Sequence, residues 1–306
     1  MVSVLLAAFN GEAYLPAQLD SIRHQTLTDW RVLWQDDGSA DGTAALLQHQ
    51  DACFVPGCEQ GLHLGAIGNF LSLLRQDDAP YAALCDQDDL WHADRLSRCM
   101  AAMQEAERLY GPDTPLLVHS DCRVVDEAGQ VLHASFFRHQ GWDGNATSLP
   151  RLLVQNNVTG CTVLMNAPLR KLVTERARAE KLFMHDWFIA LTAAAFGRII
   201  FVDEALVDYR QHGANVVGAS RTGLVQRGLA ALRTPEKARA RLALAYRHAR
   251  MFRDTCASAL PPEASAIVDA YLATERMPKV RRVLALRQGG YVMQSRVARM
   301  GQILLG

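Results

Sequence analysis

The sequence predicts an α/β fold in which helices cover both faces of a mainly parallel sheet. Three observations lead to this prediction. Over the first 100 residues, short apolar runs alternate with amphipathic segments, and the connections between them are short. The apolar runs are continuous, as they are in strands that are buried on both faces. Several of them end in Asp-rich polar residues, and sheets of this class bind ligands at the carboxyl ends of their strands.

The first half of the chain supplies four strands and the helices between them. Apolar runs predict strands at 2–9, 31–35, 53–55 and 81–85. Residues Leu15, Leu19 and Ile22 recur at helical spacing, which predicts a helix that ends near residue 25. Asp41 is a favoured N-cap for a second helix, which runs to about residue 50. Further helices are predicted at 67–74 and 92–109.

The second half is less regular. Strands are predicted at 116–119, 123–125, 131–132, 163–165 and 198–202, and helices at 167–181 and 187–196. Residues 136–147 are aromatic and polar, contain glycine and show no clean periodicity. We therefore expect a loop there, placed over a site.

The charge of the chain is divided unevenly, although it sums to zero. Residues 1–218 hold 16 Lys and Arg against 27 Asp and Glu, a net −11, and residues 219–306 hold 16 against 5, a net +11. The basic part predicts helices at 227–252 and 280–305, and Gly289-Gly290 divides the second into two shorter helices. This pattern favours contact with an anionic membrane over nucleic acid. Two alternatives stay open, a homodimer surface and a tail that neutralises its own acidic body.

Composition limits the class of protein. No apolar run approaches the roughly 18 to 20 residues of a membrane-spanning helix. Seven irregularly spaced cysteines argue against a disulfide framework and fit a reducing, cytoplasmic compartment. Residues 2–9 are expected to be a core strand and not a signal peptide. We expect a body at 1–218, with halves at about 1–115 and 116–218, and a helical extension at 219–306.

Three carboxylates, Asp86, Asp88 and Asp89, follow the predicted strand at 81–85. Carboxylates this close repel one another, and burying them is costly without a cation. Oxygen ligands of this kind suit Mg²⁺ or Mn²⁺ bound to a phosphate. The alternative is that Asp88 or Asp89 is the N-cap of the following helix. No glycine-rich dinucleotide or P-loop motif is present, so a metal is needed to hold a diphosphate.

Asp186 stands at the start of the apolar helix predicted at 187–196. Asp is a favoured N-cap, and a carboxylate at a helix end is also well placed to act as a catalytic base. The residue type alone leaves both interpretations open. His212, taken alone, is more typical of a structural histidine.

These motifs together resemble the family 2 inverting glycosyltransferases, which have the GT-A fold. One set of motifs lies at 2–11, 14–15, 18–22, 25–26, 36–39 and 41–43. A second set, at 86–91, 159–161, 185–187 and 209–215, is similar to the branch labelled rhamnosyltransferase. The match covers about residues 1–218. It implies a Rossmann-like mixed sheet with helices on both sides.

The resemblance implies a role for each matching residue. Phe9 would lie against the nucleobase, and Asp37 would accept a hydrogen bond from pyrimidine N3–H. Asp88 would be the main metal ligand, and Asp186 the base that deprotonates the acceptor. His212 would contribute to the metal or diphosphate site, and Asp86 would lie near the ribose. Asn10, Glu12 and Gln87 would help to bind the nucleotide sugar, and the sugar and acceptor pocket would contain Trp91, Gly160, Cys161, His185, Trp187 and Arg210. Ala7 departs from the family, in which many members have Thr.

The implied activity is metal-dependent transfer of a sugar, with inversion, during cell-surface polysaccharide or lipopolysaccharide synthesis. The implied donor is dTDP-L-rhamnose, with a UDP-hexose as the alternative, and the acceptor is a saccharide or a lipid-linked saccharide. The expected location is the cytoplasmic face of the inner membrane, by peripheral contact. Two other classes stay open, a non-catalytic nucleotide-sugar-binding module and a nucleotidyltransferase, although the latter lacks a phosphate-binding loop rich in glycine and lysine.

Overall fold

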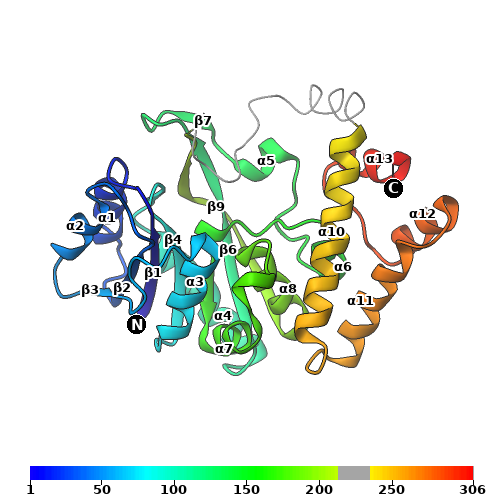
Figure 1. Ribbon diagram of the computed structural model, residues 1–306, viewed down its shortest axis with the longest axis horizontal. Helices are drawn as coiled ribbons and strands as arrows, with labels where there is room; N and C mark the ends of the chain where they lie inside the picture. Colours follow the sequence, from blue (N-terminus) through cyan, green and yellow to red (C-terminus); the bar gives the residue numbers. More distant parts are fainter. Residues whose placement is uncertain (213–234, 306) are drawn as a thin grey trace.

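A single sheet forms the centre of the computed structural model, which describes residues 1–212 and 235–305 (Figure 1). Its strand order is β3-β2-β1-β4-β8-β6-β9-β5, and β7 pairs with β6. The strands are β1 (Val2–Ala8), β2 (Trp30–Asp36), β3 (Phe54–Pro56), β4 (Tyr81–Asp86), β5 (Leu90–Trp91), β6 (Leu116–Val125), β7 (Val131–His133), β8 (Leu164–Asn166) and β9 (Arg198–Arg210). Strands β3, β2, β1 and β4 are parallel, whereas β8 is antiparallel to both of its neighbours. The predicted α/β class and mixed sheet are confirmed.

Helices cover both faces of this sheet. They are α1 (Leu15–Arg23), α2 (Thr43–Gln48), α3 (Gly65–Gln76), α4 (Arg95–Tyr110), α5 (Phe136–Gln140), α6 (Leu149–Val154), α7 (Ala167–Arg176), α8 (His185–Phe196), α10 (Pro235–Cys256), α11 (Pro262–Thr274), α12 (Lys279–Gln288) and α13 (Arg296–Leu305), with 3-10 turns η1 (Gly160–Thr162) and η2 (Ala179–Lys181). In β1, Val4 and Leu6 pack in the core shared with α1 and α4, while Leu5 packs with α3. A continuous apolar strand is therefore buried on both sides, as predicted.

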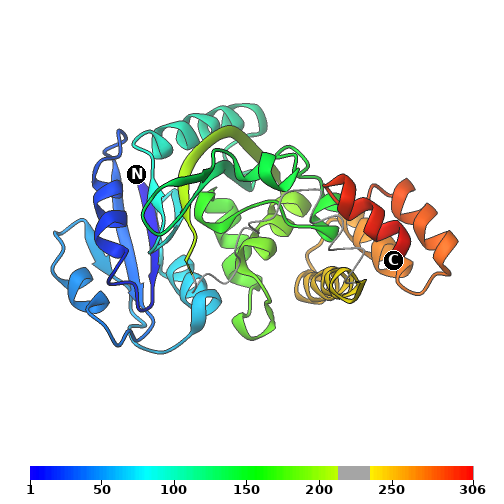
Figure 2. The ribbon, with the colours of Figure 1, turned by 90° about the horizontal axis from the view of Figure 1, so that it is seen from above.

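The C-terminal helices pack on the body of the protein. Helix α10 lies against α6, α11 and α13, and Phe188 of α8 meets Phe252 of α10 with ring centroids 5.9 Å apart. Figure 2 shows α10 to α13 at the end of the molecule opposite to β1–β3. The predicted helical extension is confirmed, and so is the break at Gly289-Gly290, which separates α12 from α13. The predicted boundary at 218, the motif residues 213–215 and the helix start at 227 lie outside the described residues.

Two predicted boundaries are wrong because strand pairing extends further than the apolar runs. Strands predicted at 116–119 and 123–125 form one strand, β6, and the strand predicted at 198–202 continues to Arg210. Strand β9 runs parallel to β6 along most of its length, from Arg198 opposite Leu116 to Arg210 opposite Val125. Polar side chains interrupt the apolar pattern of both strands, so the sequence did not show that each strand is continuous.

Two segments form different helices from those predicted. The loop predicted at 136–147 begins with α5, because Ser135 Oγ accepts a hydrogen bond from Arg138 N and Gly141 ends the turn with a φ of 68°. The helix predicted at 167–181 ends at Arg176, where Ala177 becomes extended. Within the described residues, no helix is both long and apolar enough to cross a membrane.

Candidate active site

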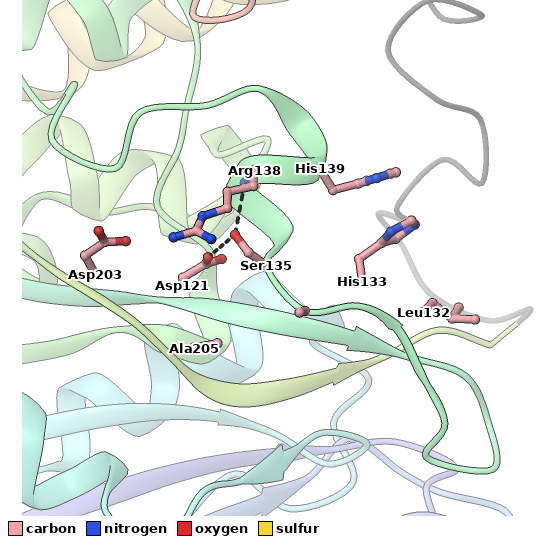
Figure 3. A pocket seen from close by; sticks show the side chains of 9 residues that line it. Asp121, Leu132, His133, Ser135, Arg138, His139, Asp203 and Ala205 are labelled. Atoms are coloured by element: carbon pink, nitrogen blue, oxygen red, sulfur yellow. Dashed lines mark hydrogen bonds between the residues drawn. The ribbon is translucent and has the colours of Figure 1, made fainter.

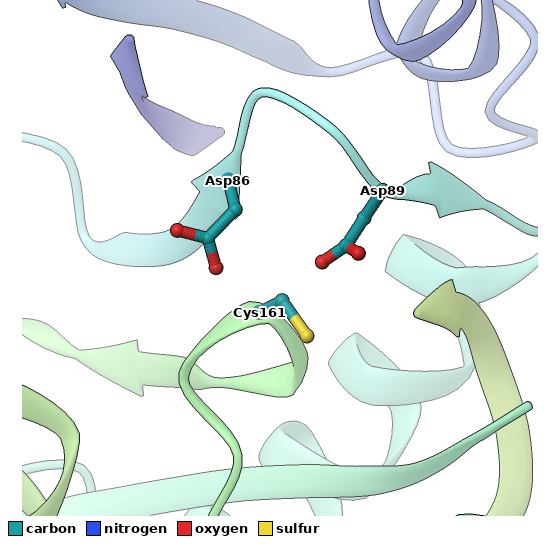
Figure 4. A group of neighbouring side chains, drawn as sticks. All are labelled: Asp86, Asp89 and Cys161. Carbon is teal, nitrogen blue, oxygen red and sulfur yellow. The ribbon is translucent and has the colours of Figure 1, made fainter. Parts of the chain in front are cut away.

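The carboxylate cluster lies where β4 ends, next to the end of β1. Asp86 pairs with Ala7 in the sheet register, and Asp89 directly precedes β5. The carboxyl groups of Asp86 and Asp89 converge above Cys161, and one ligand atom of each residue lies within 4.8 Å of the others (Figure 4). Burial raises the pKa of Asp86 to about 7, and the nearby charges of Asp88 and Asp186 add to this rise. The cluster therefore holds more negative charge than its surroundings offset.

Asp89 is not a helix cap. Strand β5 pairs with β9 directly after it, and α4 begins only at Arg95, with Asp94 at the N-cap position. The Asp89 Oδ1 atom accepts a hydrogen bond from the main-chain N of Arg210 at 3.1 Å, while Oδ2 is buried and has no partner among the described residues. The N-cap interpretation of the cluster is wrong because two residues after Asp89 are extended. The Cys161 thiol also hydrogen-bonds to the Asp89 carboxylate, and a bound cation would stabilise this buried group further.

Asp88 and His212 are brought together from positions 124 residues apart, with 2.7 Å between Asp88 Oδ2 and His212 Nε2. Tyr14 stacks on the His212 ring at 4.7 Å. The Arg210 side chain donates from Nε to the Asp88 main-chain O at 3.0 Å and from Nη1 to the main-chain O of Glu127. The end of β9 thus fixes the loop that carries Asp88. That both residues bind metal stays a prediction.

The loops on the expected donor side are tied together by side chains. Gln87 accepts a hydrogen bond from Phe9 N and donates one to Phe9 O, both at 2.7 Å. Asn10, with a left-handed φ of 48°, accepts from Ala40 N, and Glu12 accepts from the N of Gly42. The Phe9 ring is left half-exposed beside the cluster. This is the exposure that stacking on a base would need.

Asp37 is engaged by the main chain. Its two carboxylate oxygens accept hydrogen bonds from Leu64 N at 2.5 Å and Gly65 N at 2.8 Å, at the start of α3. The predicted contact with a pyrimidine stays a prediction, and the structure adds a helix-anchoring role. His63 was missed by the sequence reasoning. Its ring lies 6.5 Å from that of Phe9 and packs over Gly38, where an added Cβ would stand 2.4 Å from the imidazole.

Asp186 lies in the first turn of α8 and faces the cluster. Met184 holds the N-cap position, so the N-cap interpretation of Asp186 is wrong. Its Oδ1 atom accepts a hydrogen bond from Trp187 N at 2.6 Å, and burial raises the pKa of Asp186 to about 6. A Cβ added to Gly160 would stand 3.6 Å from Asp186 Cβ and 3.3 Å from His185 Nε2. Gly160 therefore packs directly against Asp186 and His185, and an added Cβ would crowd the His185 ring.

Three residues expected in the sugar pocket make contacts with other groups of the protein, and their role in binding a sugar stays a prediction. Trp91 is buried beneath the guanidinium of Arg95, which lies 3.4 Å from its ring centroid. Trp187 is also buried, and its Nε1 donates to Leu152 O at 2.7 Å. The His185 ring stacks on Phe70 at 4.5 Å, and burial lowers the pKa of His185 to about 4, so its ring is neutral.

Arg95 is the main supporting residue that the sequence reasoning missed. It is fully buried and donates from Nη2 to the main-chain oxygens of Cys161 at 2.7 Å and Leu84 at 3.3 Å. These bonds hold η1 against the end of β4. Burial raises the pKa of the Cys161 thiol, so it stays protonated and is a poor metal ligand.

A separate open cavity of about 480 Å³ is lined by residues of β6 and β9 and by residues of β7 and α5 (Figure 3). Its lining includes the charged side chains of Asp121, Arg138 and Asp203 and the stacked rings of His133 and His139, 3.6 Å apart. Asp121 is engaged by Phe137 N and Ser135 Oγ. No residue predicted for the site lines this cavity.

The residues at the end of β4 fit a divalent cation. Asp86 has a raised pKa, Asp89 has an unpartnered oxygen, and Asp88 offers a third carboxylate. Hard oxygen ligands of this kind match Mg²⁺ or Mn²⁺. A cation would remove the cost of their mutual repulsion.

Comparison with known proteins places this geometry in context. Residues 3–114 match the family model of glycosyl transferase family 2. The chain is 24% identical over 233 residues to the dTDP-rhamnosyl transferase RfbG of Shigella flexneri, covering 70% of this chain and 74% of that protein. It is 24% identical over 243 residues to the putative glycosyltransferase EpsH of Bacillus subtilis, covering 76% and 67%.

Solved structures share the fold. S. aureus TarS superposes with a TM-score of 0.57 at 17% identity, over 89% of this chain, and this chain spans only 43% of TarS. A TarS fragment, residues 1–349 in complex with UDP-GlcNAc, gives a TM-score of 0.54 at 16% identity over 99% of this chain and 88% of the fragment. These identities are too low to carry more than the fold.

Proposed function

The chain carries a family 2 glycosyltransferase domain of GT-A fold, and from this premise we propose that it transfers a sugar, with inversion, from a nucleotide sugar to a hydroxyl of a saccharide acceptor. The process would be cell-surface polysaccharide or lipopolysaccharide synthesis. One observation carries the proposal: burial raises the pKa of Asp86, and Asp186, from α8, lies close enough for its charge, together with that of Asp88, to raise that pKa further. Asp186 would then act on the acceptor hydroxyl, while Asp86 and Asp88 would act at the metal ion that binds the donor diphosphate.

The proposed donor is dTDP-L-rhamnose, with a UDP-hexose as the alternative. Similarity to a dTDP-rhamnosyl transferase supports the first. A relative named as a UDP-Glc-dependent glucosyltransferase, 26% identical over 103 residues, supports the second. The half-exposed ring of Phe9 is the proposed base contact, and Asn10, Glu12, Asp37 and Gln87 shape its surroundings.

Asp88 would be the main ligand of Mn²⁺ or Mg²⁺, with His212 beside it, and the converging carboxylates of Asp86 and Asp89 would lie close to the ion. The bound ion supplies positive charge near the leaving diphosphate. Arg210 and Tyr14 fix the Asp88 loop from the far side, so the carboxylates are oriented before the substrate arrives. A fold-related mannosyltransferase was solved with GDP-Man and Mn²⁺, at a TM-score of 0.50.

Asp186 is the proposed base. Its carboxylate takes the proton of the acceptor hydroxyl while that oxygen forms a bond to the anomeric carbon. The bond from this carbon to the diphosphate breaks on the opposite face, and the diphosphate leaves with the electron pair. A pKa of about 6 keeps Asp186 ionised at neutral pH and makes it more basic than an ordinary Asp. No enzyme nucleophile is needed for inversion.

The proposed acceptor is a saccharide on a lipid carrier or on lipopolysaccharide. Peripheral contact of the C-terminal helices with an anionic membrane would place the protein at the cytoplasmic face of the inner membrane. Residues 1–218 are the proposed catalytic domain, and residues 219–306 are its proposed extension. The two halves of that domain share one sheet, in which β8 lies between β4 and β6.

A screen of dTDP- and UDP-sugars with Mn²⁺, by thermal shift and product formation, tests the proposal. Asp186→Asn should retain the ligand-induced rise in Tm and lose sugar transfer by about 10²-fold or more. The exposed Glu180→Gln is the matched control and should keep both. Binding without transfer in the wild type, unchanged by Asp186→Asn, would show a binding module. Pyrophosphate release from a nucleoside triphosphate would show a nucleotidyltransferase.

A further inference from the structure

Helices α12 and α13 expose large apolar side chains at helical spacing. In α12, Val280 and Leu284 are 74% and 53% exposed, and they lie four residues apart on one face. In α13, Met300 is 58% exposed, and Ile303 and Leu304 lie beside it on the same face. We call these five residues, together with Arg281, Arg287 and Arg296, the α12–α13 surface. Apolar groups gathered in this way on a protein exterior mark a binding surface.

The charge of this region has a single sign. Residues 276–306 contain seven Lys and Arg and no Asp or Glu. The exposed side chains of Arg281, Arg287 and Arg296 form no ion pair within the described chain. Arginines of α10 behave differently, because Arg250 pairs with Glu275 and Arg253 with Asp269. The positive charge of the α12–α13 surface is thus left for a partner.

The two helices are fixed to each other and to the molecule. Lys279 donates from Nζ to the main-chain O of Leu304 at 2.5 Å, which joins the start of α12 to the end of α13. Gln302 binds the connecting segment through Met293 N and Tyr291 O. The Tyr291 hydroxyl donates to Ile267 O in α11 at 2.7 Å. The exposed side chains therefore project from a rigid support, at the far end from β1–β3 (Figure 2).

We propose that the α12–α13 surface docks on an anionic lipid bilayer, with its apolar side chains in the headgroup region and its arginines on lipid phosphates. Charge complementarity selects this partner, because arginines flanking apolar residues are the pattern of a helix that lies in a membrane interface. The proposal rests on the proposed function for its biological sense, since a lipid-linked acceptor is presented at such a surface. The physical argument needs only the residues above.

The test is flotation of the full chain with vesicles of phosphatidylcholine containing phosphatidylglycerol, compared with pure phosphatidylcholine. The wild type should bind the anionic vesicles and lose binding as salt rises. The double substitution Arg281→Gln with Arg287→Gln should weaken partitioning by about 30-fold, because each arginine near an anionic surface contributes about fivefold. Leu284→Gln with Met300→Gln should weaken it by about tenfold or more.

The controls remove one positive charge and one apolar side chain at exposed positions elsewhere. Lys171→Gln on α7 and Leu109→Gln on α4 should leave flotation unchanged. All variants should retain the wild-type Tm, because the replaced side chains are at the surface. Equal binding to neutral vesicles, or equal loss in the controls, would overturn the proposal. A wild-type dimer that becomes monomeric in the α12–α13 variants, without vesicle binding, would also overturn it and identify a second copy as the partner.

Transfer to a lipid-free saccharide acceptor separates this proposal from the proposed function. The α12–α13 variants should keep wild-type transfer in that assay, since they lie away from Asp186. If the wild type floats with anionic vesicles but transfers no sugar, docking stands and the proposed function fails. If it transfers sugar but does not float, docking fails and the function stands.

Discussion

Asp86→Asn should make the metal-free protein more stable at neutral and alkaline pH. Burial and the charges of Asp88 and Asp186 raise the pKa of Asp86 from 3.8 to about 7. At 1.36 kcal/mol for each pKa unit, the ionised side chain would cost at most about 4 kcal/mol. Asp86 is only partly buried by exposed area, so solvent screening reduces the expected gain to about 1 to 2 kcal/mol. For a chain of 306 residues the Tm should rise by about 2 to 3 °C.

The sign of the pH dependence follows from the direction of the shift. Because the folded-state pKa is above the unfolded value, the folded protein binds this proton more tightly, and stability falls as pH rises from about 4 to 7. The Asn variant carries no such cost. Its advantage should therefore be full at about pH 8 and absent near pH 4.

The assay is thermal unfolding of wild type and Asp86→Asn across this pH range, with and without Mn²⁺. The metal should raise the Tm of the wild type and raise that of the variant less, because a ligand is lost. Asp113→Asn, at an exposed carboxylate, is the control and should change neither value. A variant no more stable than the wild type at about pH 8, or one equally stabilised at about pH 4, would refute the reasoning.

Three further predictions concern the site. The transfer rate should fall as pH drops through about 6, because Asp186 must be ionised to act as a base, and a pH–rate profile without an acidic limb would contradict this role. Arg95→Met should lower stability by about 2 to 4 kcal/mol in denaturant unfolding, since the buried oxygens of Cys161 and Leu84 lose their donor; unchanged stability would be the contrary result. Gln87→Ala should raise the KM for the nucleotide sugar by about tenfold with a smaller change in kcat, because the Phe9 main chain loses two hydrogen bonds, and an unchanged KM would count against it.

The parallel part of the fold was predictable because its signals are local. Apolar runs in the sequence predict the strands at 31–35 and 81–85, and a pair of glycines predicts the break at Gly289-Gly290. The length of β9 was not predictable, since Asp203, Glu204 and Asp208 interrupt its apolar pattern and only pairing with β6 keeps it extended. Helix α5 has only five residues, too few to show a helical pattern in the sequence. It depends on the hydrogen bond from Arg138 N to the side chain of Ser135.

The site shows the same division. Charge density alone pointed to Asp86, Asp88 and Asp89. The position of Asp186 at a helix start left its role open, and the resemblance assigned it the role of base. The pairing of Asp88 with His212 spans 124 residues and needs the sheet order to be known. The roles of Asp89 and Arg95 were hidden for the same reason, because the main-chain groups of Arg210 and Cys161 that they contact come from distant segments.

The place of β8 between β4 and β6 has a consequence for how the chain is made. During synthesis β4 can pair with β1 at once, but its other edge waits for residues 164–166. Asp88 waits longer, for His212, 124 residues later, which is about 6 to 25 s at ribosomal speeds of about 5 to 20 residues per second. Until residues 164–166 are made, an unpaired apolar edge adjoins three carboxylates. A fragment that stops near residue 115 would keep this edge permanently and should aggregate.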